Sequence, residues 1–120
     1  MDPKIQKAFE AANYMSTLAT QKQILKEEYH QNLIYYHNGG TFKATRELIN
    51  FIETLLFRGY DTDVVLMDDN DLPIEVSDLK SFSEDILSKY FESINRYYHR
   101  YSNLKKSKSV ERLIDLWLKV

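Results

Sequence analysis

Helix-breaking residues are scarce in this chain, and their positions constrain its fold more than any other feature. The sequence has only two prolines and three glycines. Pro3 suits the first turn of a helix, where its missing N–H costs nothing, and no breaker follows before Gly39 and Gly40. Apolar residues recur through this interval at steps of three and four. The spacing predicts one long helix over residues 3–37, ended by Asn38 and Gly39 in the left-handed conformation.

A second helix is predicted over residues 44–58. Thr41 or Thr45 is a candidate N-cap, and Gly59 follows as the C-terminal stop. Apolar side chains surround most of this segment. We therefore expect it to be the most buried helix, with Phe51 in the core.

The pattern changes to short apolar runs over residues 63–76. Val64–Met67 and Leu72–Val76 flank an acidic tetrapeptide, Asp68–Asp71, as two strands flank a turn. Pro73 cannot donate a main-chain hydrogen bond, so it suits only an edge strand. A small β-hairpin is predicted here, and because a lone hairpin is marginally stable it should lean on helices.

Two more helices complete the predicted fold. Ser77 is a candidate N-cap for a helix over residues 78–105, and Ser109 for a short helix over residues 109–118. The expected fold is mainly α: an elongated helical bundle of about four helices with a small β-hairpin insertion, in a single domain over residues 1–120. A first helix of the predicted length is about 50 Å long, whereas a compact globule of this size has a radius of gyration of about 14 Å. The uncovered apolar surface predicts a homo-oligomer.

Composition excludes several classes of protein. The chain is 43% hydrophobic and 28% charged, which is ordinary for a soluble protein, and it has no cysteine for a disulfide or a thiolate zinc site. The N-terminus lacks the apolar core of a signal peptide, and no apolar run approaches the ~18 residues of a membrane span. We expect a cytoplasmic protein that does not enter a membrane.

Charge is unevenly spread along the chain. The segment from Asp61 to Asp85 is acidic and that from Arg96 to Arg112 is basic. Such separation can orient a partner or a second copy, although two solvated faces are the simpler interpretation.

No arrangement of residues indicates catalysis. The chain has no Gly-x-Ser-x-Gly elbow, no glycine-rich phosphate loop and no thiol. Glu27 and His30 are spaced as helical neighbours, but one such pair is more typical of an ion pair than of a metal site. The acidic turn lacks the glycine and terminal glutamate of an EF-hand, which leaves cation binding at the hairpin open. We predict no enzyme activity, no metal and no cofactor.

The most suggestive residues are aromatic and basic. A tyrosine precedes each histidine, at His30, His37 and His99. Near the last of these lies a candidate interface or anion-binding set: Arg96, Tyr98, His99, Arg100, Lys105 and Lys106. Aromatic rings can stack on bases while basic groups neutralise phosphates. The competing interpretation is helix packing, because Tyr97 and Tyr101 fall on the apolar stripe and basic residues favour a helix C-terminus.

Four stretches resemble a known group of proteins. They are Asp2-Pro3-Lys4-Ile5-Gln6 followed by Ala11-Ala12-Asn13-Tyr14-Met15, then Asn32-Leu33-Ile34-Tyr35-Tyr36, and Leu48-Ile49-Asn50-Phe51. In these the chain resembles small uncharacterised proteins of T-even-like marine bacteriophages. The resemblance implies a viral accessory or assembly protein that binds a phage or host macromolecule in the host cytoplasm, and it carries no catalytic residues.

The sequence therefore predicts a non-enzymatic protein-interaction module with a phage or host protein as partner. The alternative is a nucleic-acid or nucleotide-binding protein that uses the basic aromatic segment Arg96–Lys108. Retention on heparin with a steep salt dependence would distinguish the two, because phosphate neutralisation weakens as salt rises.

Overall fold

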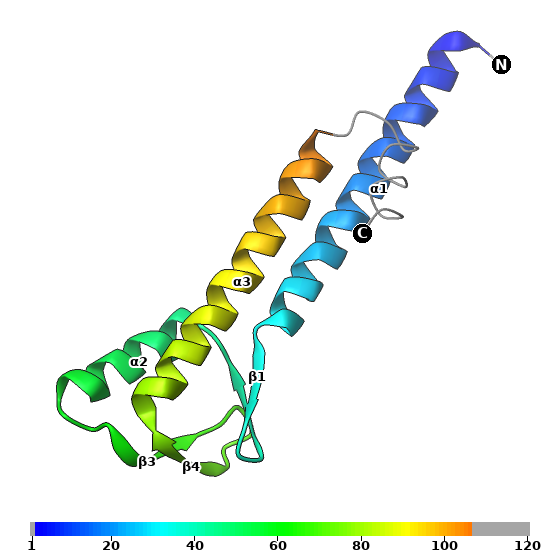
Figure 1. Cartoon of the computed structure of the whole chain (residues 1–120). Helices are drawn as coiled ribbons and strands as arrows, with labels where there is room; N and C mark the ends of the chain where they lie inside the picture. The colour runs from blue at the N-terminus through cyan, green and yellow to red at the C-terminus, as the bar shows by residue number, and fades with distance from the viewer. Residues whose placement is uncertain (1, 107–120) are drawn as a thin grey trace. The chain divides into compact units, whose positions relative to one another are not determined.

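A computed structural model describes residues 2–106 of the chain (Figure 1). Its elements are, in order, α1 (Pro3–Asn32), β1 (Ile34–His37), β2 (Gly40–Lys43), α2 (Arg46–Phe57), β3 (Thr62–Met67), β4 (Pro73–Asp78) and α3 (Leu79–Lys105). They belong to two compact units. Among the described residues, the first comprises α1 as far as Tyr29 and α3 from Arg96, and the second is His30–Asn95.

The predicted bundle of about four helices is wrong. Residues 2–106 form three helices and two antiparallel two-stranded sheets, an α+β arrangement. The predicted helix over residues 109–118 lies outside the described residues. Within those residues, no helix combines the length and apolar character needed to cross a membrane.

The largest difference lies where the first helix was predicted to continue to residue 37. Helix α1 ends at Asn32, whose carbonyl accepts a hydrogen bond of 3.0 Å from the Ser93 hydroxyl. The chain then forms the β1–β2 hairpin, in which His37 pairs with Gly40. Asn38 and Gly39 between them have φ of 48° and 81°. Two successive positive φ values make a two-residue hairpin turn of type I′, so Asn38-Gly39 reverses a strand rather than ending a helix.

Helix α2 begins as predicted but is not the most buried helix. The Thr45 hydroxyl accepts a hydrogen bond of 3.2 Å from the Leu48 N–H, which confirms Thr45 as the N-cap. Ile52 is the one fully buried residue of α2, and Phe51 is 53% exposed. The expectation that Phe51 lies in the core is therefore wrong.

The second hairpin and the helix after it agree more closely with the prediction. Strands β3 and β4 pair antiparallel from Thr62 opposite Asp78 to Met67 opposite Pro73. The N-terminal cap of α3 is Asp78 rather than Ser77, because the Asp78 carboxylate accepts a hydrogen bond of 3.1 Å from the Ser81 N–H. An acidic cap also interacts favourably with the positive end of the helix dipole.

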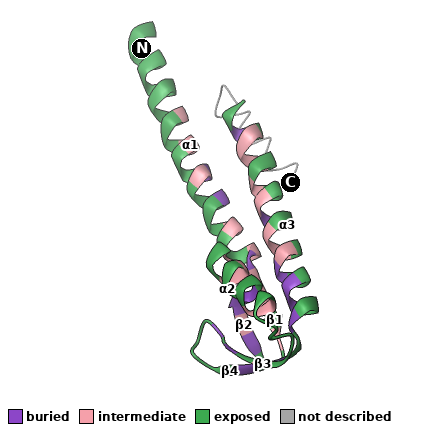
Figure 2. Cartoon of the chain, turned by 90° about the vertical axis from the view of Figure 1, so that its left-hand side faces the viewer, coloured by how far each residue is buried: buried purple, intermediate pink, exposed green. Residues whose placement is uncertain are grey.

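The core of the second unit joins both hairpins to α3 (Figure 2). Its most completely buried side chains are Phe42, Ile52, Val76, Leu79, Phe82 and Ile86. Phe82 is at the centre of an aromatic cluster, with ring centroids 5.1 Å from Phe42 and 5.1 Å from His37. Because side chains alternate along a strand, Tyr35 and His37 face Phe82 together, while Tyr36 between them is 72% exposed.

In the first unit α1 packs against the C-terminal part of α3. Leu25 and Leu104 are its buried apolar residues, and the rings of Tyr29 and Tyr97 lie 5.0 Å apart. The first turns of α1 are coloured as exposed in Figure 2, and Phe9 there is 63% exposed. The N-terminal part of the predicted apolar stripe is thus not covered by the described residues.

Candidate functional site

The structure divides the basic aromatic residues predicted as a site. Arg100 forms an ion pair with Glu28, and its side chain is only 12% exposed. Lys105 lies with its ammonium 5.3 Å from the centre of the half-buried Tyr101 ring, a cation–π contact. Lys105 is nevertheless exposed, as are the remaining members of the set, Arg96, Tyr98, His99 and Lys106. Arg100 is therefore largely buried and already paired with Glu28.

Helical geometry separates the exposed members further. At 3.6 residues per turn, residues seven apart share a face. Tyr98 and Lys105 therefore lie on one flank of α3, and His99 and Lys106 on another. Arg96 lies close to the second flank, about 60° from His99. The exposed members of the predicted set are thus spread over about 180° of the helix circumference.

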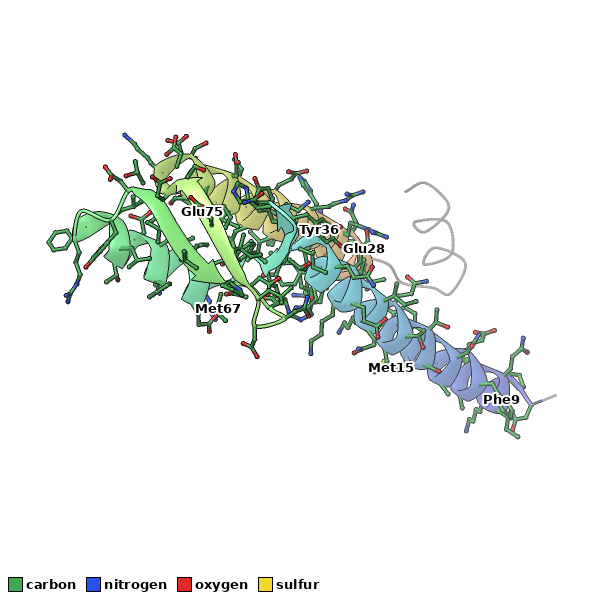
Figure 3. The ribbon with its side chains drawn as sticks, turned by 90° about the horizontal axis from the view of Figure 1, so that it is seen from below. Phe9, Met15, Glu28, Tyr36, Met67 and Glu75 are labelled. Carbon is green, nitrogen blue, oxygen red and sulfur yellow. The ribbon has the colours of Figure 1, made fainter. Side chains whose placement is uncertain are left out.

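The β3–β4 hairpin carries a different candidate surface, which is an exposed face with apolar residues. The inward face carries the half-buried Val64 and the buried Leu66, Ile74 and Val76. The opposite face, which we call the hairpin outer face, consists of Val65, Met67, Pro73 and Glu75. Val65 is 61% exposed and Met67 is 57% exposed, although both lie in a regular strand. Figure 3 labels Met67 and Glu75 on this hairpin.

The Asp68 carboxylate fixes the turn of the hairpin. It accepts hydrogen bonds from the N–H groups of Thr41 at 3.0 Å and of Asn70 and Leu72 at 2.9 Å each. These bonds, of which that from Thr41 has the largest effect, hold the pKa of Asp68 below its ordinary value. One carboxylate thereby ties β2 to the β3–β4 turn.

The β1–β2 hairpin covers one side of β4. The Asn38 amide donates a hydrogen bond of 3.1 Å to the Glu75 carbonyl. Gly40 is buried so closely against Ile74 that a Cβ at Gly40 would lie 2.5 Å from Ile74 Cγ1. Strand β3 has a strand neighbour only on its β4 side within the described part of the chain. The hairpin is thus anchored through β4, and β3 forms its outer edge.

The surroundings of this edge are acidic. Residues 30–95 contain five lysines and arginines against twelve aspartates and glutamates, a net charge of −7. The rest of the chain contains eleven against six, a net charge of +5, and together these give the total of −2. Asp61 and Asp63 lie at the start of β3, and Asp69 and Asp71 lie just beyond its end.

The acidic side chains here do not gather as metal ligands would. Within residues 2–106, no group of three or more histidines, aspartates and glutamates is arranged to hold a metal ion. Asp68 already accepts three main-chain hydrogen bonds. Asp85 accepts a hydrogen bond of 2.8 Å from the Tyr35 hydroxyl, and burial together with this contact raises the pKa of Tyr35 to about 12.

Sequence reasoning identified the hairpin but missed its outer face. The available signal was the run Val64-Val65-Leu66-Met67, in which every side chain is apolar although a hairpin against helices buries only one face. Two of the four were therefore bound to point outward. Sequence periodicity alone could not say which two, because a shift of one residue exchanges the faces.

Comparison with known proteins identifies no relative: no family model, no curated protein and no solved structure matches the chain.

Proposed function

We propose that this chain is a non-enzymatic protein-interaction module whose contact surface is the hairpin outer face. The observation that carries the proposal is the exposure of Val65 and Met67 side by side on a sheet whose turn and second strand are held by specific hydrogen bonds. Apolar side chains on a preorganised surface bind a partner at little entropic cost, because the surface does not have to be ordered first.

The surroundings of these residues support the same function. Leu72, next to the hairpin turn, is 51% exposed, and Glu75 lies directly across the strands from Val65. An apolar centre with a charged margin is the usual composition of a protein–protein interface. Methionine adapts its shape to a partner more readily than branched side chains do.

The resemblance to small bacteriophage proteins suggests the biological setting. We propose a viral accessory or assembly protein that acts in the host cytoplasm and binds a phage or host protein. This setting and the choice of partner rest on the resemblance, whereas the contact surface rests on the hairpin.

Nucleic-acid binding through Arg96–Lys108 is the second candidate. Its support is the positive charge outside residues 30–95 together with exposed Tyr98 and His99. The ion pair of Arg100 with Glu28 weakens it, because Arg100 is then not available to a phosphate.

Variants that change one surface at a time test the proposal. Val65→Ser with Met67→Ser removes the apolar centre of the hairpin outer face, and Tyr98→Ser removes an aromatic ring that is 70% exposed on α3. We expect the first variant to lose the proteins that co-purify with the tagged wild-type chain from its source cells, and the second to retain them. Thermal unfolding of all three proteins checks that the fold is intact.

The opposite result would favour the second candidate. Loss of co-purifying material only in Tyr98→Ser, together with salt-dependent retention of the wild type on heparin, would replace the hairpin with the basic segment as the contact surface. Retention of every partner by both variants would exclude both surfaces.

A further inference from the structure

The hydrogen-bond pattern of the β3–β4 hairpin determines what its free edge presents. The Asp68 N–H donates to the Leu72 carbonyl at 2.9 Å, which makes these two residues a hydrogen-bonded pair. Hydrogen-bonded and non-hydrogen-bonded pairs alternate along an antiparallel ladder. Leu66 with Ile74 is therefore hydrogen-bonded, and Val65 with Glu75 is not.

Two observations on β4 agree with this assignment. The Glu75 carbonyl accepts its hydrogen bond from Asn38 and so points away from β3. Pro73, which has no N–H to donate, also occupies a non-hydrogen-bonded position, opposite Met67. The main-chain N–H and C=O groups of Val65 and Met67 must likewise point away from β4, along the outer edge of β3.

We propose that the outer edge of β3 binds an extended segment of a partner protein as an additional strand, and that this segment alternates apolar and basic residues. This inference rests on the proposed function and names its mode of binding and the chemistry of its partner. The main-chain groups of Val65 and Met67 pair with the added strand, as in other complexes formed by β-strand addition. Apolar side chains of that strand lie beside Val65 and Met67 on the hairpin outer face.

The acidic residues around the outer edge of β3 indicate why the added strand should carry basic residues. Asp61 and Asp63 lie at one end of the edge, Asp69 and Asp71 at the other, in a unit with a net charge of −7. Lysine or arginine at either end of the added strand would lie close to these carboxylates and form ion pairs with them. Steering by opposite charge also raises the rate of association at low salt.

A second copy of this chain fits the same edge poorly. Antiparallel pairing of two β3 strands about an axis at Val65 brings Asp61 toward Asp69 of the second copy. Pairing about Met67 brings Asp63 toward Asp71 instead. Like charges placed opposite each other destabilise a strand pair, so these two registers, centred on the exposed apolar residues, are disfavoured.

Amide hydrogen exchange measured by NMR tests the proposal on the intact chain. The probe is a capped peptide of alternating lysine and valine, matched in length to β3. In the free protein we expect the amides of Val65 and Met67 to exchange at least tenfold faster than that of Leu66, which bonds to β4. Saturating peptide should slow exchange at Val65 and Met67 at least tenfold, and a glutamate–valine peptide should not.

A main-chain variant separates the edge from the face. Val65→Pro keeps an apolar side chain and removes an N–H that points outward, as Pro73 already does on β4. Val65→Thr keeps the N–H. We expect Val65→Pro to weaken peptide binding at least tenfold and Val65→Thr to weaken it by less than threefold. Should Val65→Pro unfold, hydrogen exchange of the wild type decides alone.

Strand addition at β3 and contact through the hairpin outer face are tested by different results. Unchanged exchange at Val65 and Met67 under saturating peptide, or equal binding by Val65→Pro and wild type, overturns strand addition. Equal protection by the glutamate–valine peptide overturns the basic partner. If co-purifying proteins are still lost from Val65→Ser with Met67→Ser, the hairpin outer face remains the contact surface and only its mode of binding is wrong.

Discussion

Gly40 shows how a single residue fixes the packing of one hairpin on the other. A Cβ at this position would lie 2.5 Å from Ile74 Cγ1 and 3.1 Å from the Phe42 ring. Cγ1 is not the far end of the isoleucine side chain, so it cannot move aside alone. The close approach of β2 to β4 thus requires a residue without a side chain.

Gly40→Ala should accordingly destabilise the protein by about 1–3 kcal/mol, the usual cost of overpacking a core. Chemical denaturation measures the change. The matched control is Gly39→Asn, because nothing lies within 4 Å of a Cβ at Gly39, and asparagine tolerates its φ of 81°. A smaller loss for Gly40→Ala than for Gly39→Asn would contradict the packing described.

Asp68 makes the stability of the second unit depend on pH. Its pKa is lower in the folded chain than in the unfolded chain, so its contribution is fully present above the ordinary aspartate pKa of about 3.9 and is lost as the pH falls through the folded value. Asp68→Asn should lower the unfolding free energy at neutral pH, and the difference from wild type should shrink in acid. Urea denaturation over a pH series tests this.

Asp69→Asn is the matched control, because it makes the same change of charge one residue away and its carboxylate is not the acceptor of the turn's hydrogen bonds. We expect it to change stability much less than Asp68→Asn does. A constant difference between Asp68→Asn and wild type at every pH would show that the carboxylate charge does not hold the turn.

Among the elements, the first hairpin explains why part of the fold could not be predicted. Leu33 and Tyr36 continue the helical spacing of α1, so periodicity extended the helix through them. Strand-favouring residues at Ile34 and Tyr35, followed by Asn38-Gly39, are in fact a strong signal for a type I′ hairpin. A continued helix and a hairpin are both compatible with the local sequence. Contacts of the hairpin with β4, whose residues are distant in sequence, favour the hairpin.

The β3–β4 hairpin and helices α2 and α3 were predictable, because the local sequence signals in these segments all favour the same elements. An acidic turn, Pro73 at an edge position and a cap at Thr45 all favour the observed elements. The orientation of α2 was also predictable, although the prediction missed it. Apart from Phe57, the apolar residues of α2 occupy one face of the helix, with Ile52 near its middle and Phe51 at its margin.

Substitution of these neighbouring residues tests the orientation of α2. Ile52 is completely buried, so Ile52→Ala should cost about 2–5 kcal/mol through lost contacts and a cavity. Phe51→Ala should cost less than about 1 kcal/mol, because more than half of the side chain is already exposed. Equal losses in chemical denaturation would mean that the helix is turned differently.

The whole molecule combines an acidic unit with a chain remainder of opposite charge. The acidic unit carries the hairpin outer face, and the basic remainder includes the exposed apolar residues Ile5, Phe9 and Met15 of α1. Large exposed apolar side chains favour association, and Ile5 and Phe9, four residues apart, lie on the same face of α1. The net charge of +5 comes from residues 96–120, whereas residues 1–29 have no net charge, so the hairpin outer face lies in an acidic unit and the α1 surface in a neutral segment.

We propose that the N-terminal turns of α1 associate with a second copy of the chain. Light scattering at tens of micromolar protein should give a mass above that of the monomer, and Phe9→Lys should return it to the monomer mass, because a charge would then be buried in the contact. Phe57→Lys is the control, since Phe57 is 93% exposed but lies on α2. A monomer mass for the wild type would contradict self-association.

Site-specific photo-crosslinking in the source cells shows directly whether the hairpin outer face is the contact surface, because it records what touches this face while Val65 and the main chain of β3 stay in place. A photoreactive amino acid replaces Met67 in one protein and Tyr98 in another, both of which are well exposed. We expect a discrete protein adduct from position 67 that disappears when Val65→Pro is added, and no protein adduct of comparable yield from position 98. An adduct only from position 98, or none from position 67 while partners still co-purify, would contradict this expectation.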